Sequence, residues 1–198
     1  MESFNQSLFL FLNAPAHPQP WLLQLAMLLA EYLIWLVPIG LVAGWLRATE
    51  PTRRWLLVAT VSGLVGLACN QAIGLVWQHP RPFMIGLGHT FLAHAPDSSF
   101  PSDHLTLWWS VTGVVLFARR FRSLGAALVL MGLPIAWARI YLGVHFPLDM
   151  AGAAVVACLS VTVTQATAHW FVPSLYRTAL AIHRVLFHRL IQRGWVMD

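Results

Sequence analysis

Long apolar stretches alternate with short polar ones along most of this chain. A membrane-spanning helix needs about 20 consecutive apolar residues, and several stretches approach or exceed that length. The pattern predicts an all-α, polytopic membrane bundle of about five spanning helices, folded as a single domain over residues 1–198. The predicted spans cover residues 21–46, 55–77, 102–118, 124–142 and 148–172, and the third of them is short.

Two segments outside these stretches predict helices that lie along the membrane surface. Residues 3–12 are largely apolar but too short to cross a bilayer, and Asn13 and Pro15 end them. After Pro173, arginine and histidine repeat at helical spacing among apolar residues. This pattern is typical of a basic amphipathic helix on an anionic membrane surface. We therefore expect interfacial helices near both ends of the chain.

The composition supports an integral membrane protein. The chain is 58% hydrophobic and 10% charged, whereas soluble domains carry about 25% charged residues. Cys69 and Cys158 both lie within apolar stretches, which argues against a disulfide framework or a zinc motif. No basic region precedes the first apolar stretch, so we expect the first span to act as its own insertion signal. Nothing in the pattern indicates nucleic-acid binding.

All twelve basic residues are arginine, and their placement predicts an orientation. Five spans put loops 47–54 and 119–123 and the segment after Pro173 on one side of the membrane, and these hold ten of the twelve arginines. Only Arg81 and Arg139 lie on the other side. Because positively charged loops stay in the cytoplasm, we expect the sparsely charged side to face the periplasm or the exterior.

The sparsely charged side carries a polar stretch, residues 138–149, between two apolar runs. Pro147 suits the first turn of a helix, which puts His145 just before that helix and Asp149 in its first turn. Asp149 can then bind one imidazole nitrogen of His145 and leave the other free to attack, as in activated nucleophiles. Arg139 can bind an anionic oxygen through two hydrogen bonds. These residue types together favour a phosphate site.

Two further polar stretches lie at the ends of the longest loop, residues 78–103, on the same side. The second of them is a helix start, which offers unpaired N–H groups and a positive dipole end to a phosphate. Two arginines would complete a clamp, His145 would attack phosphorus, and His104 would act as the general acid for the leaving oxygen. The stretches are His79-Pro80-Arg81-Pro82 and Pro101-Ser102-Asp103-His104.

Together these stretches resemble the signature of the type 2 phosphatidic acid phosphatase superfamily. That signature has three parts: Lys-x6-Arg-Pro, Pro-Ser-Gly-His and Ser-Arg-x5-His-x3-Asp. The third part matches at Arg139, His145 and Asp149, with Ala138 in place of Ser. The second matches at Pro101, Ser102 and His104, with Asp103 in place of Gly. The first matches only at Arg81-Pro82, because the position of the Lys is taken by Gly74.

The Pro-Ser-Asp-His variant, the His-Pro-Arg-Pro-Phe sequence and the short length are similar to the bacterial undecaprenyl-pyrophosphate phosphatase branch. The resemblance implies hydrolysis of undecaprenyl pyrophosphate to the monophosphate in the bacterial cytoplasmic membrane, which recycles the cell-wall carrier lipid. It also implies a phosphohistidine on His145, oriented by Asp149, with His104 protonating the departing lipid phosphate. No metal or other cofactor is implied. The residues that would hold the transferred phosphoryl group are Arg81, Ser102 and Arg139.

Four residues near these motifs have open or secondary roles. Asp103 would repel a phosphate, and helix capping is favoured over pairing with an arginine. Glu31 lies within the first span, either as a functional carboxylate or as one near the interface or paired with an arginine. His79 is a possible accessory residue. If the two arginines and the helix start already hold the phosphate, Gly74 is a packing residue within a span.

Three other functions compete with this one. A related lipid phosphatase acting on phosphatidylglycerophosphate or phosphatidic acid fits the same motifs, which recognise only the phosphate. A lipid transporter would not need His145 and Asp149 in register. A metal or haem membrane protein would lack regular ligand spacing and would place two arginines beside a cation, which is unfavourable. Its candidate ligands are His79, His89, His94 and His104.

Overall fold

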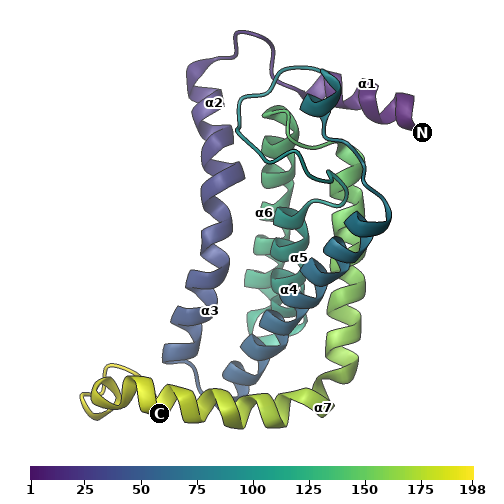
Figure 1. The fold of residues 1–198 in the computed structure, drawn as a ribbon. Helices are drawn as coiled ribbons and strands as arrows, with labels where there is room; N and C mark the ends of the chain where they lie inside the picture. Colours follow the sequence, from purple (N-terminus) through teal and green to yellow (C-terminus); the bar gives the residue numbers. More distant parts are fainter.

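The computed structural model describes residues 1–198, and every regular element in it is helical. Helical passes run alternately down and up the molecule, which confirms the predicted polytopic bundle (Figure 1). Short 3-10 turns, η3 (Pro82–Ile85) and η4 (Arg119–Phe121), lie in two of the connections. The passes are Pro20–Arg47, α4 (Glu50–Val76), α5 (Asp103–Phe117), α6 (Arg122–Tyr141) and the first half of α7 (Pro147–Gln192).

Four of these passes are long and apolar enough to cross a membrane, and α5 is the exception. It has 15 residues, which is about 22 Å at 1.5 Å per residue. It packs against α4, α6 and α7 at once, and its Leu105, Trp108 and Val114 are buried. The short third span predicted from the sequence is therefore an inner helix that contacts mainly protein.

The first pass is not one regular helix. A π-helical turn, η1 (Leu28–Tyr32), and a 3-10 turn, η2 (Leu33–Trp35), join α2 (Pro20–Met27) to α3 (Leu36–Arg47). Such π-turns are frequent at functional sites, and η1 packs against α6. Glu31 lies in η1, is exposed and forms no ion pair. The pairing with an arginine that the sequence left open for Glu31 is therefore not formed.

The two predicted interfacial helices lie at opposite ends of the molecule (Figure 1). α1 (Glu2–Leu12) is a separate helix, as expected, and it ends at Asn13. The C-terminal one is not a separate helix. It is the second half of α7, which is 46 residues long and continues through Pro173. This second half turns and runs along the base of the bundle, as expected where proline removes a backbone hydrogen bond (Figure 1).

Buried Arg53, in α4, binds both α3 and the segment that follows α7. Its Nη2 donates to the Met197 carbonyl at 2.6 Å and its Nε to the Trp45 carbonyl at 3.0 Å. The indole N–H of Trp45 donates to Nδ1 of His183, on α7, at 3.2 Å. These contacts fix the surface segment of α7 relative to the first pass.

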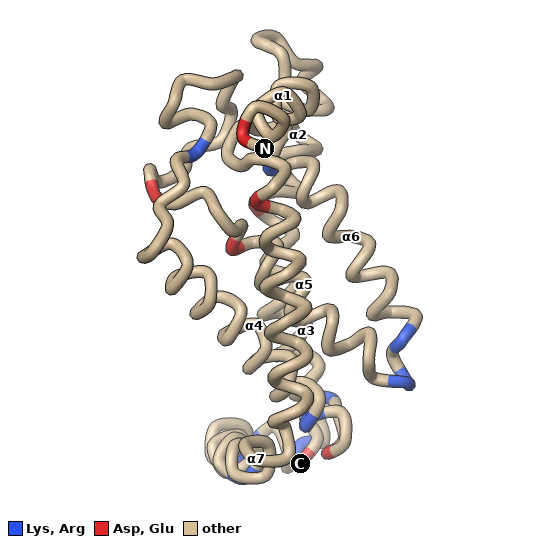
Figure 2. Tube along the Cα trace, turned by 90° about the vertical axis from the view of Figure 1, so that its right-hand side faces the viewer, with Lys and Arg blue, Asp and Glu red and all other residues tan.

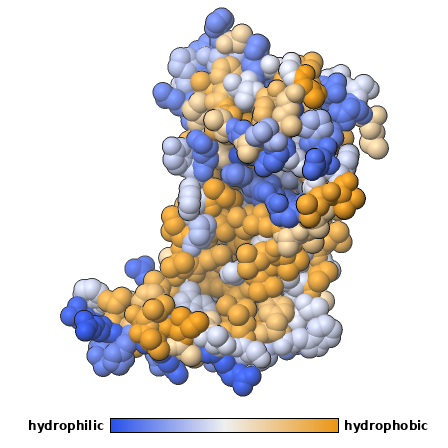
Figure 3. All heavy atoms as spheres, viewed as in Figure 1, coloured by the Kyte–Doolittle hydropathy of each residue, from blue (hydrophilic) through white to orange (hydrophobic).

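Apolar and charged side chains occupy different zones of the molecular surface. A broad apolar zone covers the middle of the face shown in Figure 3, with polar side chains above it and along the end of α7. Most arginines gather at the end of the bundle where the second half of α7 lies (Figure 2). Arg81 and Arg139 lie near the opposite end, beside the start of α7, as the predicted topology requires.

The long loop between α4 and α5 is held against the bundle rather than free. The Asn13 side chain donates to the His89 and Tyr141 carbonyls at 2.9 and 3.0 Å, and its Oδ1 accepts from the His89 N–H at 2.7 Å. Gly143 lies opposite His89 with φ +82°, and a Cβ there would approach the His89 carbonyl oxygen to 2.2 Å. Only glycine fits this crossing.

Candidate active site

The start of α7 holds a buried histidine against a buried carboxylate. Pro147 is the first residue of the helix, Asp149 lies in its first turn and His145 precedes it, as predicted. Nδ1 of His145 lies 3.1 Å from Oδ2 of Asp149. The same oxygen accepts the backbone N–H of Phe146 at 2.7 Å and the hydroxyl of Ser99. Three donors thus fix the carboxylate that orients the imidazole.

Two guanidinium groups converge on the other nitrogen of His145. Nη1 of Arg81 and Nη2 of Arg139 lie 3.1 and 3.3 Å from Nε2. A guanidinium can only donate, so Nε2 must present its lone pair and Nδ1 must carry the proton. This is the tautomer in which Asp149 accepts a proton and Nε2 is free to act as a nucleophile.

The electrostatics keep this imidazole neutral. Burial lowers the pKa of His145 well below its ordinary value, and the charges of Arg139 and Arg81 lower it further. His145 therefore has a free lone pair at neutral pH. An anion placed between the two guanidinium groups would lie directly in front of it.

Arg81 is positioned by the long loop. Its Nε and Nη2 both lie 2.8 Å from Oδ1 of Asp97. Its Nη1 donates to the Val144 carbonyl at 2.9 Å, and Nη2 donates to the Ser98 carbonyl at 3.2 Å. The guanidinium is thus fixed from the loop and from the start of α7 together.

Arg139 comes from the last turn of α6 and is buried. Its Nη1 donates to the Ala30 carbonyl in η1 at 3.4 Å. Its Nε has no partner within the protein. The irregular turn that contains Glu31 therefore helps to hold Arg139, although Glu31 itself does not bind it.

The start of α5 brings two more of the predicted residues to the same place. Ser102 precedes the helix, and its backbone N–H donates to the Asp149 carbonyl at 3.3 Å. The hydroxyl of Ser102 is buried without a partner. His104, in the first turn of α5, has Arg139, His94 and Arg81 as its electrostatic neighbours. All six residues predicted for catalysis and phosphate binding therefore gather at one end of the bundle.

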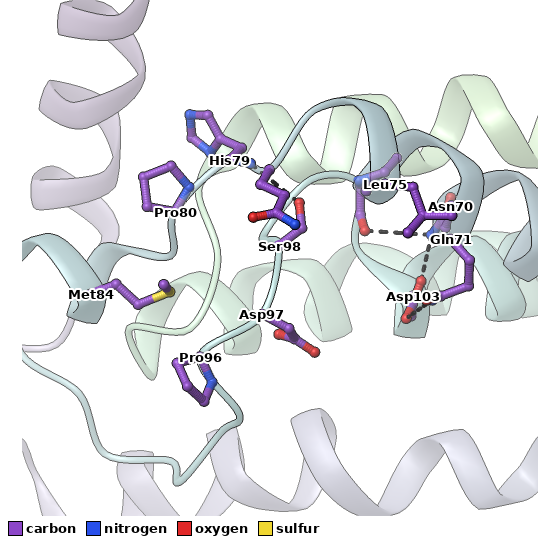
Figure 4. A pocket seen from close by; sticks show the side chains of 13 residues that line it. Asn70, Gln71, Leu75, His79, Pro80, Met84, Pro96, Asp97, Ser98 and Asp103 are labelled. Carbon is purple, nitrogen blue, oxygen red and sulfur yellow. Dashed lines mark hydrogen bonds between the residues drawn. The ribbon is translucent and has the colours of Figure 1, made fainter.

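Asp103 does not cap α5, contrary to the prediction. It is the first residue of the helix, and no side chain caps that end. Its two carboxylate oxygens accept from Asn70 at 2.8 Å and from Gln71 at 3.2 Å, both on α4 (Figure 4). Neutral amides thus satisfy the carboxylate and join α4 to α5. No arginine pairs with it.

Gly74 lies within α4, as predicted, but near the end of the helix and beside polar rather than apolar groups. It borders a polar cavity of about 340 Å³ beside α4, which Asp97, Ser98 and Asp103 also line (Figure 4). A Cβ at Gly74 would lie 3.5 Å from that of Ser98. A lysine there would enter a cavity that is lined by the carboxylates of Asp97 and Asp103 and not by His145.

His79 lies beside the site without reaching the two arginines. Its Nε2 is 3.5 Å from a carboxylate oxygen of Glu2 in α1, and its ring packs edge-on against Phe146. Its backbone carbonyl accepts the N–H of Ser99 at 2.8 Å. These contacts support the loop and α1. No three His, Cys, Asp or Glu side chains form a group that could hold a metal ion.

Three residues of the long loop enter the site without having been predicted there. Ser99 binds Asp149, Asp97 binds Arg81, and the ring of His94 packs edge-on against that of His145 at 6.1 Å between centroids. All three belong to residues 94–99, directly before the Pro101-Ser102 motif. Their proximity to that motif was the only signal in the sequence.

Comparison with known proteins places this geometry in a family. A family model described as the PAP2 superfamily matches residues 54–173, which include every residue of the site. The chain belongs to the PAP2 superfamily. The resemblance drawn from its motifs is confirmed, and the chain is a multi-pass membrane protein of that superfamily.

Two curated relatives and two solved structures are similar to this chain. The chain is 38% identical to YbjG of Escherichia coli K12, named as a candidate undecaprenyl-diphosphatase, over the whole of both chains. It is 36% identical to the undecaprenyl-diphosphatase BcrC of Bacillus subtilis, covering 78% of this chain and 79% of BcrC. The fold matches Aquifex aeolicus LpxE with a TM-score of 0.69 at 21% identity, over 82% of this chain and 95% of LpxE. It also matches the PAP2-type phosphatidylglycerolphosphate phosphatase of B. subtilis with a TM-score of 0.58 at 19% identity, over 86% of this chain and 87% of that protein.

Proposed function

We propose that this protein hydrolyses undecaprenyl diphosphate to undecaprenyl phosphate and inorganic phosphate, and so recycles the cell-wall carrier lipid. The observation that carries the proposal is the convergence of Arg81 and Arg139 on Nε2 of His145, while Asp149 binds Nδ1. The names of the YbjG and BcrC relatives support the diphosphate lipid as substrate.

The proposed reaction has two steps on one histidine. Nε2 of His145 attacks the terminal phosphorus, an N–P bond forms, and the P–O bond to the bridging oxygen breaks. His104 gives its proton to the departing undecaprenyl phosphate. His104 then takes a proton from water, which attacks the phosphohistidine, breaks the N–P bond and releases inorganic phosphate. Asp149 stabilises the positive charge that develops on the imidazole.

Hydrogen-bond donors that already surround Nε2 of His145 would hold the phosphoryl group. Arg81 and Arg139 neutralise the charge that spreads over the equatorial oxygens, and Ser102 supplies a hydroxyl at the start of α5. Preorganised positive charge of this kind supplies most of the catalysis in phosphoryl transfer. The unpartnered Ser102 hydroxyl and Arg139 Nε support this assignment.

A phosphate-release assay on the purified protein tests the substrate. Undecaprenyl diphosphate should have a higher kcat/KM than phosphatidic acid or phosphatidylglycerophosphate. A preference for phosphatidylglycerophosphate would instead favour the runner-up, a related lipid phosphatase. This chain shares its fold with a B. subtilis phosphatidylglycerolphosphate phosphatase.

The ten-to-two division of arginines supports a site on the outer face of the bacterial cytoplasmic membrane. In a background lacking Cys69 and Cys158, Thr90→Cys in the exposed loop should react with a membrane-impermeant maleimide on intact cells. Ser123→Cys, exposed at the arginine-rich end, should react only after permeabilisation. Labelling of Ser123→Cys alone on intact cells would overturn the orientation.

Turnover should survive chelation. The proposed chemistry uses two guanidinium groups, a hydroxyl and a helix start where other phosphatases use metal ions. We expect kcat/KM for the lipid diphosphate to be unchanged by EDTA. Loss of activity in EDTA that Mg²⁺ restores would show that a cation takes part.

A further inference from the structure

His94 lies in the site but has no part in the mechanism above. The long loop carries it over His145, and the two rings meet edge-on with centroids 6.1 Å apart and planes 76° apart. Its side chain is 20% exposed. A loop histidine that only faced solvent would not be packed against the nucleophile.

His94 shares a carboxylate with Arg81: its Nδ1 lies 3.8 Å from the Asp97 oxygen that accepts from Nε of Arg81 at 2.8 Å. Arg81 and Arg139, which meet at Nε2 of His145, are also its cationic neighbours. His104, the proposed acid, lies close enough for the charges of the two histidines to interact. His94 therefore lies against the ring of His145 and beside the carboxylate that holds Arg81.

The hydrogen bonds of His94 leave one nitrogen available. Nδ1 donates to the Ala95 carbonyl at 3.2 Å and lies 3.8 Å from Oδ1 of Asp97. Nε2 makes no hydrogen bond to the protein. The ring is thus held by its loop-side edge, with the opposite edge free to bind a ligand.

A bound phosphate would change the charge state of this ring. Burial lowers the pKa of His94, and the positive charge of Arg81 is the next largest cause. A dianion between the arginines offsets that repulsion and favours the imidazolium. Nε2 would then carry a proton and become a charge-assisted donor to a phosphate oxygen.

We propose that Nε2 of His94 binds the phosphoryl group transferred to His145, as a third cationic contact supplied by the loop rather than by α4. The proposal rests on the proposed function for the identity of the lipid diphosphate, but its chemistry requires only a phosphate. The family signature has a lysine at the position of Gly74 in α4. Here Gly74 borders a cavity that Asp97 and Asp103 line, and the loop would supply the cation instead.

Binding of inorganic phosphate to the purified full-length protein in detergent tests the proposal, with ³¹P NMR as readout. His94→Ala should weaken phosphate binding about 10- to 100-fold, the range for a lost charged hydrogen bond. His94→Lys, which keeps a cation, should bind phosphate more tightly than the neutral His94→Gln. His89→Ala is the matched control: it lies in the same loop, is exposed, and should bind phosphate like the unmodified protein.

The same variants are then compared in turnover. His94→Ala should raise KM for the lipid diphosphate, and phosphohistidine should still form at saturating substrate. Unchanged phosphate binding in His94→Ala overturns the proposal. So does a result in which His94→Gln binds like the unmodified protein while His94→Lys does not, because that order indicates a packing role. If the unmodified protein prefers another lipid phosphate, the proposed substrate fails while the phosphate titration still decides the role of His94.

Discussion

His145→Ala should abolish turnover and any covalent phosphoenzyme. Nε2 of His145 is the proposed nucleophile, and the guanidinium groups of Arg81 and Arg139 both contact it. Removing a nucleophile of this kind costs at least about 10⁴-fold in rate. The measurement is rapid quench with a substrate labelled on its terminal phosphate. The quench should be alkaline, because the N–P bond of phosphohistidine hydrolyses in acid.

His104→Ala is the informative comparison for that experiment. It removes the proposed acid and leaves His145 and Asp149 in place, so phosphohistidine should still form from an aryl phosphate, whose leaving group needs little protonation. On the lipid diphosphate its turnover should fall. Label trapped on His145→Ala, or an aryl substrate that rescues His145→Ala and not His104→Ala, would reverse the two assignments.

Asp149→Asn should reduce turnover steeply while the protein stays folded. The carboxylate oxygen Oδ2 accepts from His145, Phe146 and Ser99, and an amide can keep some of these contacts. It loses the negative charge that stabilises a cationic imidazole. Loss of the equivalent charge in Ser-His-Asp enzymes costs about 10⁴-fold, and we expect a loss of between about 10² and 10⁴-fold here. Steady-state kcat and the thermal midpoint, measured together, check this.

Ser99→Ala gives the matched control for that substitution. It removes one donor to the Asp149 carboxylate and leaves the charge intact. Its turnover should therefore fall by only about 10-fold, the low end for a hydrogen bond to a charged group, because His145 and the N–H of Phe146 still hold the carboxylate. Equal losses in Ser99→Ala and Asp149→Asn would mean that the carboxylate acts only as an anchor for the loop.

Hydropathy and motif spacing predicted the features that depend on the local sequence. The spans, the helix start at Pro147 and the position of His145 before it follow from apolar runs and from proline chemistry close to each residue. The order of the passes then brings Arg81, Ser102 and Arg139 to one end of the bundle. Topology alone was enough for that, because α4 and α6 end, and α5 and α7 begin, at the membrane face that carries the site.

Contacts that depend on the path of the long loop could not be predicted in the same way. Ser99 and Asp97 reach Asp149 and Arg81 only because the loop crosses over the start of α7, where Gly143 makes room for it. Asp103 was expected to cap a helix because capping is local. Its actual partners, Asn70 and Gln71, lie more than 30 residues away on α4.

The length of α7 sets the depth of the His145 imidazole in the bilayer. From Pro147 to Pro173 the helix covers 27 residues, about 40 Å at 1.5 Å per residue, close to the full thickness of a bilayer with its headgroups. Its second half lies across the opposite face, where His183 contacts Trp45 and Arg53. The helix therefore holds His145 at the headgroup level of the membrane face opposite the second half of α7, where the proposed diphosphate lipid would present its phosphates without leaving the membrane.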